Sequence, residues 1–226
     1  IRVLLNKEVM SIQIIPSVLV KTKEEFISQV SGLEDSVTMI QLDIADGKFV
    51  PDTTWADPEA VKNNCDLDIE LHLMVSDPLE ELKKWKEVKQ IKRVLIHYES
   101  VPDFREVIFE LEQNTNWRIG IVINPDTSYK LIEPYLNEID SVMFMGVIPG
   151  KQGQGLIPEV LDSITNFTID YPDMFTEIDG AVNEETLPQI IKTGTKAICP
   201  GSAIFGNKKT PKENVEKMEE IINKLT

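Results

Sequence analysis

The sequence has few cysteines, no long apolar run and no excess of basic residues, and each absence excludes a class of protein. Two cysteines, Cys65 and Cys199, cannot form a disulfide framework, so we expect reduced thiols in a cytoplasmic protein. No apolar stretch approaches the roughly 20 residues that span a bilayer, and no segment has the parts of a secretory leader. The 23 Lys plus Arg and 38 Asp plus Glu give a formal net charge of −15. This charge disfavours nucleic acid and anionic membrane surfaces as partners.

The remaining composition is typical of a folded globular chain. Its 226 residues are 42% hydrophobic and 27% charged, which allows a sizeable core and argues against disorder. Met10 opens a segment typical of a native start followed by a strand, so we interpret residues 1–9 as an extension or a cloning remnant. No linker or low-complexity tract interrupts the rest, which predicts one domain over residues 10–226.

Short segments rich in Val and Ile alternate with helical patterns along the chain. Several lack polar alternation, as expected for strands buried on both faces of a parallel sheet. The expected strands are 12–16, 38–44, 68–74, 93–97, 118–123, 141–145, 175–179 and 196–199. The expected helices are 23–33, 58–64, 78–88, 101–114, 128–136, 158–167, 184–192 and 212–225, with a short one near residue 202. Strand–helix units of roughly 25–30 residues predict an α/β fold closed into a (β/α)8 barrel, with an open doubly wound sheet as the alternative.

Ionisable side chains stand at the ends of the expected strands, where the active site of a (β/α)8 barrel lies. The two histidines of the chain, His72 and His97, are both at strand ends, although either could be a core imidazole. Asp43 and Asp179 lie in or end largely apolar segments, where a carboxylate is costly to bury unless it is paired or binds a cation. A capping or turn aspartate is the alternative interpretation. Asp43, His72 and Asp179 together offer donors that suit a divalent metal such as Zn, Mn, Fe or Co.

Three turns that contain glycine follow the last three expected strands, at residues 149–155, 179–181 and 201–206. Glycine lets backbone N–H groups approach an anion, and the (β/α)8 phosphate site is often built after strands seven and eight. Turns need glycine for other reasons too, so each one alone is a weak indication. Their order along the chain predicts a phosphate site.

In this order, the segments resemble the ribulose-phosphate 3-epimerase family. The matching segments are Ile15-Pro16-Ser17-Val18-Leu19, the run from Leu42-Asp43-Ile44-Ala45-Asp46 to Pro51, Leu71-His72-Leu73-Met74, Asn124-Pro125, the run from Pro149-Gly150 to Gln154, Ile178-Asp179-Gly180 and Gly201-Ser202-Ala203-Ile204-Phe205. The resemblance implies a TIM barrel of the ribulose-phosphate-binding type. It also implies interconversion of D-ribulose 5-phosphate and D-xylulose 5-phosphate at C3, in the pentose phosphate pathway of carbohydrate metabolism.

The resemblance also implies roles for individual residues. Asp43 and Asp179 match the acid/base pair of the family and, with His72 and position 41, its ligands for one divalent metal per chain. Ser17 and Met74 match residues of the substrate pocket. The expected phosphate cradle consists of Gln152, Gly153, Gly180, Ala181, Gly201 and Ser202.

The chain departs from the family pattern at several of these positions. Gln41 replaces a histidine ligand and could offer only a neutral amide oxygen, which predicts weak metal binding. Ala45 replaces a pocket methionine, Lys48 a histidine and Ala181 the second glycine after Asp179.

Two functions remain open at this point. The first is an isomerase: a 3-epimerase acting on a small-molecule ketose phosphate. The alternative is a non-catalytic phosphosugar-binding barrel that has lost full metal binding. A decarboxylase or aldolase is disfavoured, because no lysine stands at an expected strand end. A homo-oligomer is compatible with either function.

Overall fold

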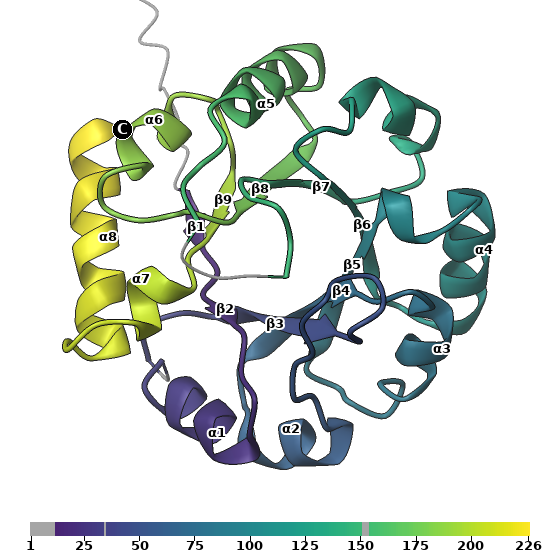
Figure 1. Cartoon of the computed structure of the whole chain (residues 1–226), viewed down its shortest axis with the longest axis horizontal. Helices are drawn as coiled ribbons and strands as arrows, with labels where there is room; N and C mark the ends of the chain where they lie inside the picture. The colour runs from purple at the N-terminus through teal and green to yellow at the C-terminus, as the bar shows by residue number, and fades with distance from the viewer. Residues whose placement is uncertain (1–11, 34, 151–153) are drawn as a thin grey trace, which may run out of the picture.

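The Val- and Ile-rich segments form one closed parallel sheet in the computed structural model, which describes residues 12–33, 35–150 and 154–226 (Figure 1). The strands are β1 (Gln13–Ile14), β2 (Ser17–Val18), β3 (Met39–Ala45), β4 (Asp68–Met74), β5 (Ile91–His97), β6 (Arg118–Ile123), β7 (Ser141–Met145), β8 (Phe175–Asp179) and β9 (Ala197–Cys199). The sheet closes because β1 pairs with β9 while β2 pairs with β3. The predicted (β/α)8 barrel is confirmed, and the open doubly wound sheet is excluded.

The first strand of the barrel is divided in two by Pro16. Proline has no N–H to donate to a neighbouring strand. Its carbonyl still accepts from the N–H of Gln41, and the N–H of Ser17 still donates to the carbonyl of Pro200. The predicted strand 12–16 contains β1 but ends before β2, so the first strand of the barrel extends two residues beyond the prediction. Its two halves pair with different neighbours, β1 with β9 and β2 with β3.

Helices surround the barrel (Figure 1). They are α1 (Lys23–Ser31), α2 (Pro58–Asn64), α3 (Pro78–Lys83), η1 (Tyr98–Ser100), α4 (Phe104–Asn114), η2 (Tyr129–Tyr135), α5 (Glu159–Asp170), α6 (Leu187–Ile191), α7 (Ser202–Phe205) and α8 (Pro211–Leu225). Several begin as their sequence indicates, with a side-chain cap before proline, as at Asp57, Asp77 and Thr210. None of the helices in the described ranges is both long enough and apolar enough to cross a membrane.

Two helical segments are tighter than the sequence predicts. The segment expected at 128–136 is a 3₁₀ helix with Pro134 inside it, because proline cannot donate the hydrogen bond that an α-helix requires. The helix expected at 78–88 ends at Lys83. Beyond it the N–H groups of Trp85 and Val88 bond to carbonyls three residues back, and Trp85 is fully buried.

Alternation along the strands separates two sets of buried side chains. One set of apolar residues, which includes Leu42, Leu71 and Phe144, packs between the strands and the helices. The other points into the barrel, where a small apolar cluster of Ile15, Leu95, Val122, Met143, Met145, Ala197 and Cys199 lies. Most buried polar residues share this inner set: Ser17, Gln41, Asp43, Glu70, His72, Arg93, His97, Ser141, Glu177 and Asp179. The barrel interior is thus unusually polar.

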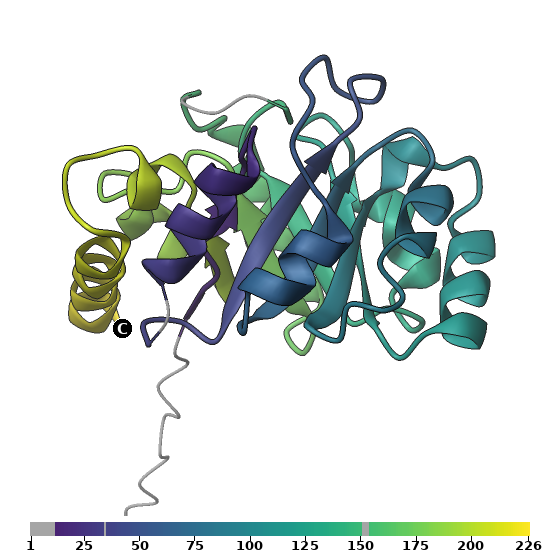
Figure 2. The same ribbon diagram turned by 90° about the horizontal axis from the view of Figure 1, so that it is seen from below.

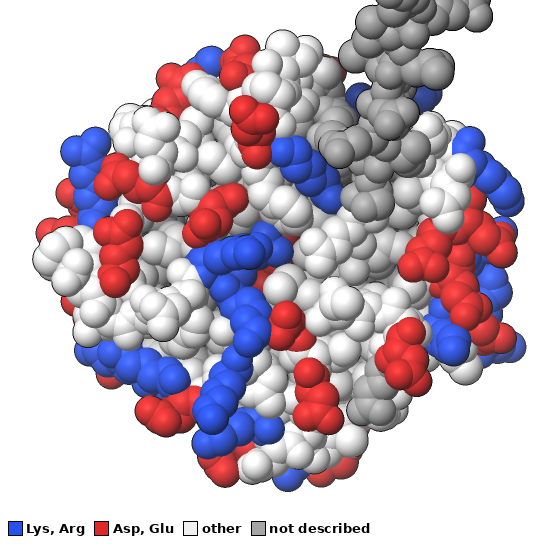
Figure 3. Space-filling model, turned by 180° about the vertical axis from the view of Figure 1, so that it is seen from behind, with Lys and Arg blue, Asp and Glu red and all other residues white. Residues whose placement is uncertain are grey.

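Basic side chains gather at the amino ends of the barrel strands. At the amino ends of the strands, Lys86, Lys89, Lys92 and Arg118 line an open hollow. Figure 3 views this end and shows Lys and Arg side chains in a line across it. At the other end, the loop after β3 rises above the barrel edge (Figure 2). The candidate site lies at that end.

Candidate active site

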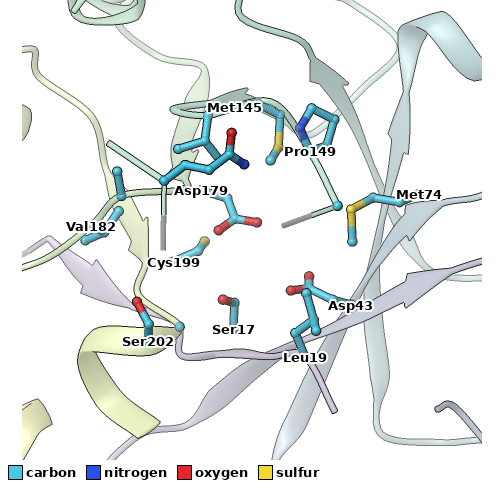
Figure 4. A pocket seen from close by; sticks show the side chains of 16 residues that line it. Ser17, Leu19, Asp43, Met74, Met145, Pro149, Asp179, Val182, Cys199 and Ser202 are labelled. Carbon is cyan, nitrogen blue, oxygen red and sulfur yellow. The ribbon is translucent and has the colours of Figure 1, made fainter. Parts of the chain in front are cut away.

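A pocket opens where the strands end (Figure 4). Its lining consists of Ser17, Leu19, Asp43, Met74, Met145, Val147, Pro149, Gly150, Gln154, Asp179, Gly180, Ala181, Val182, Cys199, Gly201 and Ser202. Figure 4 shows the carboxylates of Asp43 and Asp179 directed into the same space from different strands. The pocket therefore brings together strand ends that are far apart in the sequence.

Strand register explains why the acidic residues meet. Asp43 on β3 stands directly beside His72 on β4, and Asp179 ends β8 beside Met145 of β7. All three polar residues point inward, and their exposed fractions are 4% for Asp43, 0% for His72 and 8% for Asp179. Only side chains at the same level of a barrel can converge in this way.

The three residues form one compact donor set. His72 Nδ1 lies 2.9 Å from Asp43 Oδ1 and 3.4 Å from Asp179 Oδ2. One ligand atom from each residue lies within 4.8 Å of the others. Two carboxylate oxygens and one imidazole nitrogen match the donors that borderline divalent metals prefer. The set fits such a metal with three strong ligands.

Burial and charge shift the titration of these groups. Desolvation raises the pKa of Asp43, and the negative charge of Asp179 adds to this, although the hydrogen bond from His72 opposes it. Burial alone would lower the pKa of His72, but its hydrogen bonds to Asp179 and Asp43 outweigh burial and raise the pKa to about 10. Without a metal, a protonated His72 therefore balances part of the carboxylate charge. A metal would replace the Nδ1 proton.

Gln41 also reaches this centre, but with its amide nitrogen. Its Nε2 lies 2.7 Å from Asp43 Oδ1, 2.8 Å from Asp179 Oδ2 and 3.2 Å from His72 Nδ1. The sequence led us to expect an amide oxygen here. The carboxylates accept hydrogen bonds and would repel an oxygen, so they attract the N–H side of the amide. The Gln41 Oε1 is left buried without a hydrogen-bond partner in the described parts of the chain. Only a half-turn of the amide would present the oxygen to a metal.

The expected substrate residues that the structure describes share the pocket wall. Ser17, Met74, Gly180, Ala181, Gly201 and Ser202 all line it. Gly180 and Ala181 have φ angles of 101° and 55°, which turns the chain sharply after β8. Ala181 occupies a conformation that suits glycine better. Gln152 and Gly153 lie outside the described residues.

His97 contacts His72 through the ring nitrogen that faces away from Asp43 and Asp179. Its Nε2 lies 2.9 Å from His72 Nε2, and both side chains are fully buried. Burial lowers the pKa of His97 to about 4, so this ring is neutral near pH 7. The sequence placed His97 at a strand end but indicated no contact with His72. The apolar lining residues Leu19, Val147 and Val182 carry no chemical pattern that would have singled them out.

A second buried ionic cluster lies deeper in the barrel. Arg93 Nη2 is 2.9 Å from Glu70 Oε2, and Arg93 Nη1 is 3.1 Å from Glu177 Oε1. The guanidinium also lies 4.7 Å from the centre of the Phe175 ring. One guanidinium faces two carboxylates, and desolvation raises the pKa of both glutamates. This cluster lies in the barrel interior below the site, and none of its three residues lines the pocket.

Comparisons with known proteins agree with this geometry. The model of the ribulose-phosphate 3 epimerase family matches residues 13–205. The ribulose-phosphate 3-epimerase of Bacillus subtilis (strain 168) is 31% identical over 204 residues, covering 86% of this chain and 93% of that protein. The ribulose-phosphate 3-epimerase of Schizosaccharomyces pombe (strain 972 / ATCC 24843) is 26% identical over 190 residues, covering 82% of each.

A solved structure is similar in fold. The crystal structure of KGPDC from Streptococcus mutans superposes with a TM-score of 0.74 at 11% identity. The match covers 95% of this chain and 98% of that one. At this identity the likeness concerns the barrel alone.

Proposed function

The chain belongs to the ribulose-phosphate 3-epimerase family, and on this premise we propose that it interconverts D-ribulose 5-phosphate and D-xylulose 5-phosphate by inverting C3. The observation that carries the proposal is the pair of buried carboxylates, Asp43 and Asp179, that face one pocket from β3 and β8. In the closed sheet these strands are separated by the first strand and β9 on one side and by four strands on the other. Two acids can therefore act on a substrate from different sides.

Inversion at C3 requires two such groups. The proton leaves from one face of the carbon and returns to the other, and one base cannot reach both faces. In one direction Asp43 or Asp179 removes the proton and its partner donates one, and the roles exchange in the reverse reaction. Burial raises the pKa of Asp43 and so makes it a stronger base than an exposed carboxylate. His72 holds the carboxylates in place and takes no part in proton transfer.

A divalent metal fits the same residues. Asp43, His72 and Asp179 would hold Zn, Mn, Fe or Co, and when bound the metal would stabilise negative charge on the sugar oxygens as a Lewis acid. Gln41 would be a poor fourth ligand or would leave that position to water.

The phosphate group would bind at the turns after β7, β8 and β9. Gly150, Gly180, Gly201 and Ser202 all line the pocket. No Lys or Arg lines the described pocket wall, so backbone N–H groups and the Ser202 hydroxyl are the donors that we assign to the phosphate.

A non-catalytic phosphosugar-binding barrel is the second candidate, and Gln41 favours it. Its amide already satisfies both carboxylates by hydrogen bonds of 2.7 and 2.8 Å. The two candidates are separated by incubating the purified protein with D-ribulose 5-phosphate and each of the four metals. Formation of D-xylulose 5-phosphate supports the epimerase, and binding without turnover supports the alternative.

Replacing Gln41 by His is expected to raise the metal content of the purified protein. The variant adds an imidazole nitrogen to three existing donors, which a borderline metal prefers to an amide. Elemental analysis after dialysis against Zn²⁺ measures the effect. Gln90→His is the matched control, because Gln90 bonds to carbonyls of Lys62 and Cys65 away from the pocket. Equal metal content in Gln41→His and wild type would show that position 41 does not contact the metal.

Replacing Gly201 by Leu is expected to weaken phosphosugar binding by roughly tenfold to a hundredfold. A side chain there would fill the space that we assign to the phosphate and remove one or two charge-assisted hydrogen bonds. Calorimetric titration with D-ribulose 5-phosphate gives the affinity. Gly155→Leu is the control, since a Cβ atom added at Gly155 meets no atom within 4 Å. Unchanged affinity in Gly201→Leu would remove this turn from the phosphate site.

A further inference from the structure

The two histidines of this chain contact each other through the same ring atom. The sequence contains only His72 and His97. Their Nε2 atoms are 2.9 Å apart, and their rings stack with centres 5.1 Å apart. The other nitrogen of His72, Nδ1, faces Asp43 and Asp179. His72 therefore links the carboxylate centre to His97.

This contact determines where the hydrogens lie. A separation of 2.9 Å between two ring nitrogens requires one hydrogen between them. If His72 offers its Nδ1 lone pair to a metal, its only hydrogen is on Nε2 and must point at His97. If His72 carries hydrogens on both nitrogens, the Nε2 hydrogen still points at His97. In both cases His97 Nε2 accepts, so the hydrogen of neutral His97 is on Nδ1. The remaining arrangement, with the single hydrogen of His72 on Nδ1 and His97 Nε2 donating, would leave a bare His97 Nδ1 facing the carboxylate of Glu99, which has no hydrogen to donate.

A carboxylate faces that second nitrogen of His97. Glu99 Oε2 lies 3.5 Å from His97 Nδ1, which is long for a hydrogen bond but close enough for an electrostatic contact. A carboxylate only accepts, so it favours the tautomer with hydrogen on Nδ1. The N–H of Asn124 donates to Glu99 Oε1 over 2.9 Å, and the hydroxyl of Thr127 donates to the same oxygen. Glu99 is thus held by the loop after β6.

The ring of Phe49, in the loop after β3, also packs against His97. The centre of the Phe49 ring lies 4.9 Å from that of His97. His97 is therefore enclosed between Phe49 and His72 and has no exposed surface. This enclosure fixes the plane of the His97 ring and excludes water that could replace Glu99 as its partner.

We propose that His97 and Glu99 are positioning residues that fix the tautomer and ring orientation of His72. Glu99 holds the hydrogen on His97 Nδ1, His97 Nε2 accepts from His72 Nε2, and the His72 Nδ1 lone pair is directed at the space between Asp43 and Asp179. Partners of this kind behind a ligating histidine orient the ring and strengthen metal binding. The inference rests on the proposed function in one respect, namely that His72 is a metal ligand.

The first test reads the hydrogens directly in metal-free, untagged protein. Long-range ¹H–¹⁵N correlation spectra report the protonation of each ring nitrogen, and only two imidazoles contribute. We expect His97 with hydrogen on Nδ1, and a mixture of tautomers in Glu99→Ala. Glu133→Gln is the control, because this carboxylate accepts from Tyr171 elsewhere on the surface. Hydrogen on His97 Nε2 in wild type would overturn the proposal whether or not the protein is an epimerase.

The second test measures Zn²⁺ affinity by calorimetry. His97→Leu fills the space but removes the acceptor, and we expect it to weaken Zn²⁺ binding about 10–100-fold. His97→Gln places an acceptor near the position of Nε2 and should restore most of that affinity. Equal losses in both variants would indicate packing alone and overturn the positioning role. No loss in either would overturn it too. A wild-type protein that binds no Zn²⁺ would instead contradict the proposed metal site.

Discussion

Replacing either Asp43 or Asp179 by Asn is expected to lower the epimerisation rate by about 10²–10⁴-fold. An amide cannot take or return a proton at C3, and loss of a positioned acid or base has effects of this size. Each variant keeps the shape of the side chain, so phosphosugar affinity should fall far less than the rate. Both carboxylates are also expected metal ligands, so the comparison is made with Zn²⁺ at saturating concentration.

The control for this pair is Asp52→Asn. Asp52 is an exposed carboxylate in the loop after β3 and lies outside the pocket wall, so its amide should leave the rate unchanged. The two-carboxylate mechanism requires both Asp43→Asn and Asp179→Asn to lose most of the epimerisation rate. If one of them kept a rate within about threefold of wild type, one acid would suffice, and the inversion would need a different proton donor.

Replacing Arg93 by Met is expected to destabilise the fold by about 3–5 kcal/mol. The change leaves Glu70 and Glu177 buried with no positive charge between them. Both glutamates have raised pKa values in the folded protein because burial penalises their charged form. Protonated glutamates need no counter-charge, so the loss should be smaller near pH 5 than near pH 8. Urea unfolding at the two pH values measures both effects.

An exposed ion pair provides the comparison for Arg93. Lys83 pairs with Glu80 at 2.7 Å, but both side chains are more than half exposed, so Lys83→Met should change the stability far less than Arg93→Met. Adding Glu70→Gln and Glu177→Gln to Arg93→Met should recover part of the lost stability. A loss in Arg93→Met that is small and independent of pH would mean that water or rearrangement already compensates the two glutamates.

The barrel was predictable because most of its strands can be recognised in the sequence as short, largely apolar segments. Segments such as 118–123 and 141–145 are largely apolar on both faces, as expected in a sheet that is covered on both sides. The early end of α3 and the 3₁₀ geometry of η2 were not predictable. The shortening of α3 depends on where Trp85 must be buried, and the 3₁₀ geometry of η2 depends on how Pro134 packs. Both are decided by tertiary contacts.

The convergence of Asp43, His72 and Asp179 was predictable from strand ends alone, whereas the contacts between side chains were not. Strand position determines the level of a residue in the barrel, but not the direction of the Gln41 amide. That direction depends on the two carboxylates that it meets. The His72–His97 contact and the Arg93–Glu70 pair depend on the register between β4 and β5, and the Arg93–Glu177 pair joins β5 to β8 inside the barrel. No single segment of the sequence contains that information.

The most direct test of the account is exchange of the C3 hydrogen in heavy water. Wild-type protein, supplied with Zn, Mn, Fe or Co, is incubated with D-ribulose 5-phosphate in D₂O, and the sugar is analysed by NMR and mass spectrometry. The two-carboxylate mechanism predicts deuterium at C3 together with D-xylulose 5-phosphate, and neither in Asp43→Asn or Asp179→Asn. Binding of the sugar without any deuterium at C3, with every metal tried, would contradict the epimerase and leave the phosphosugar-binding barrel.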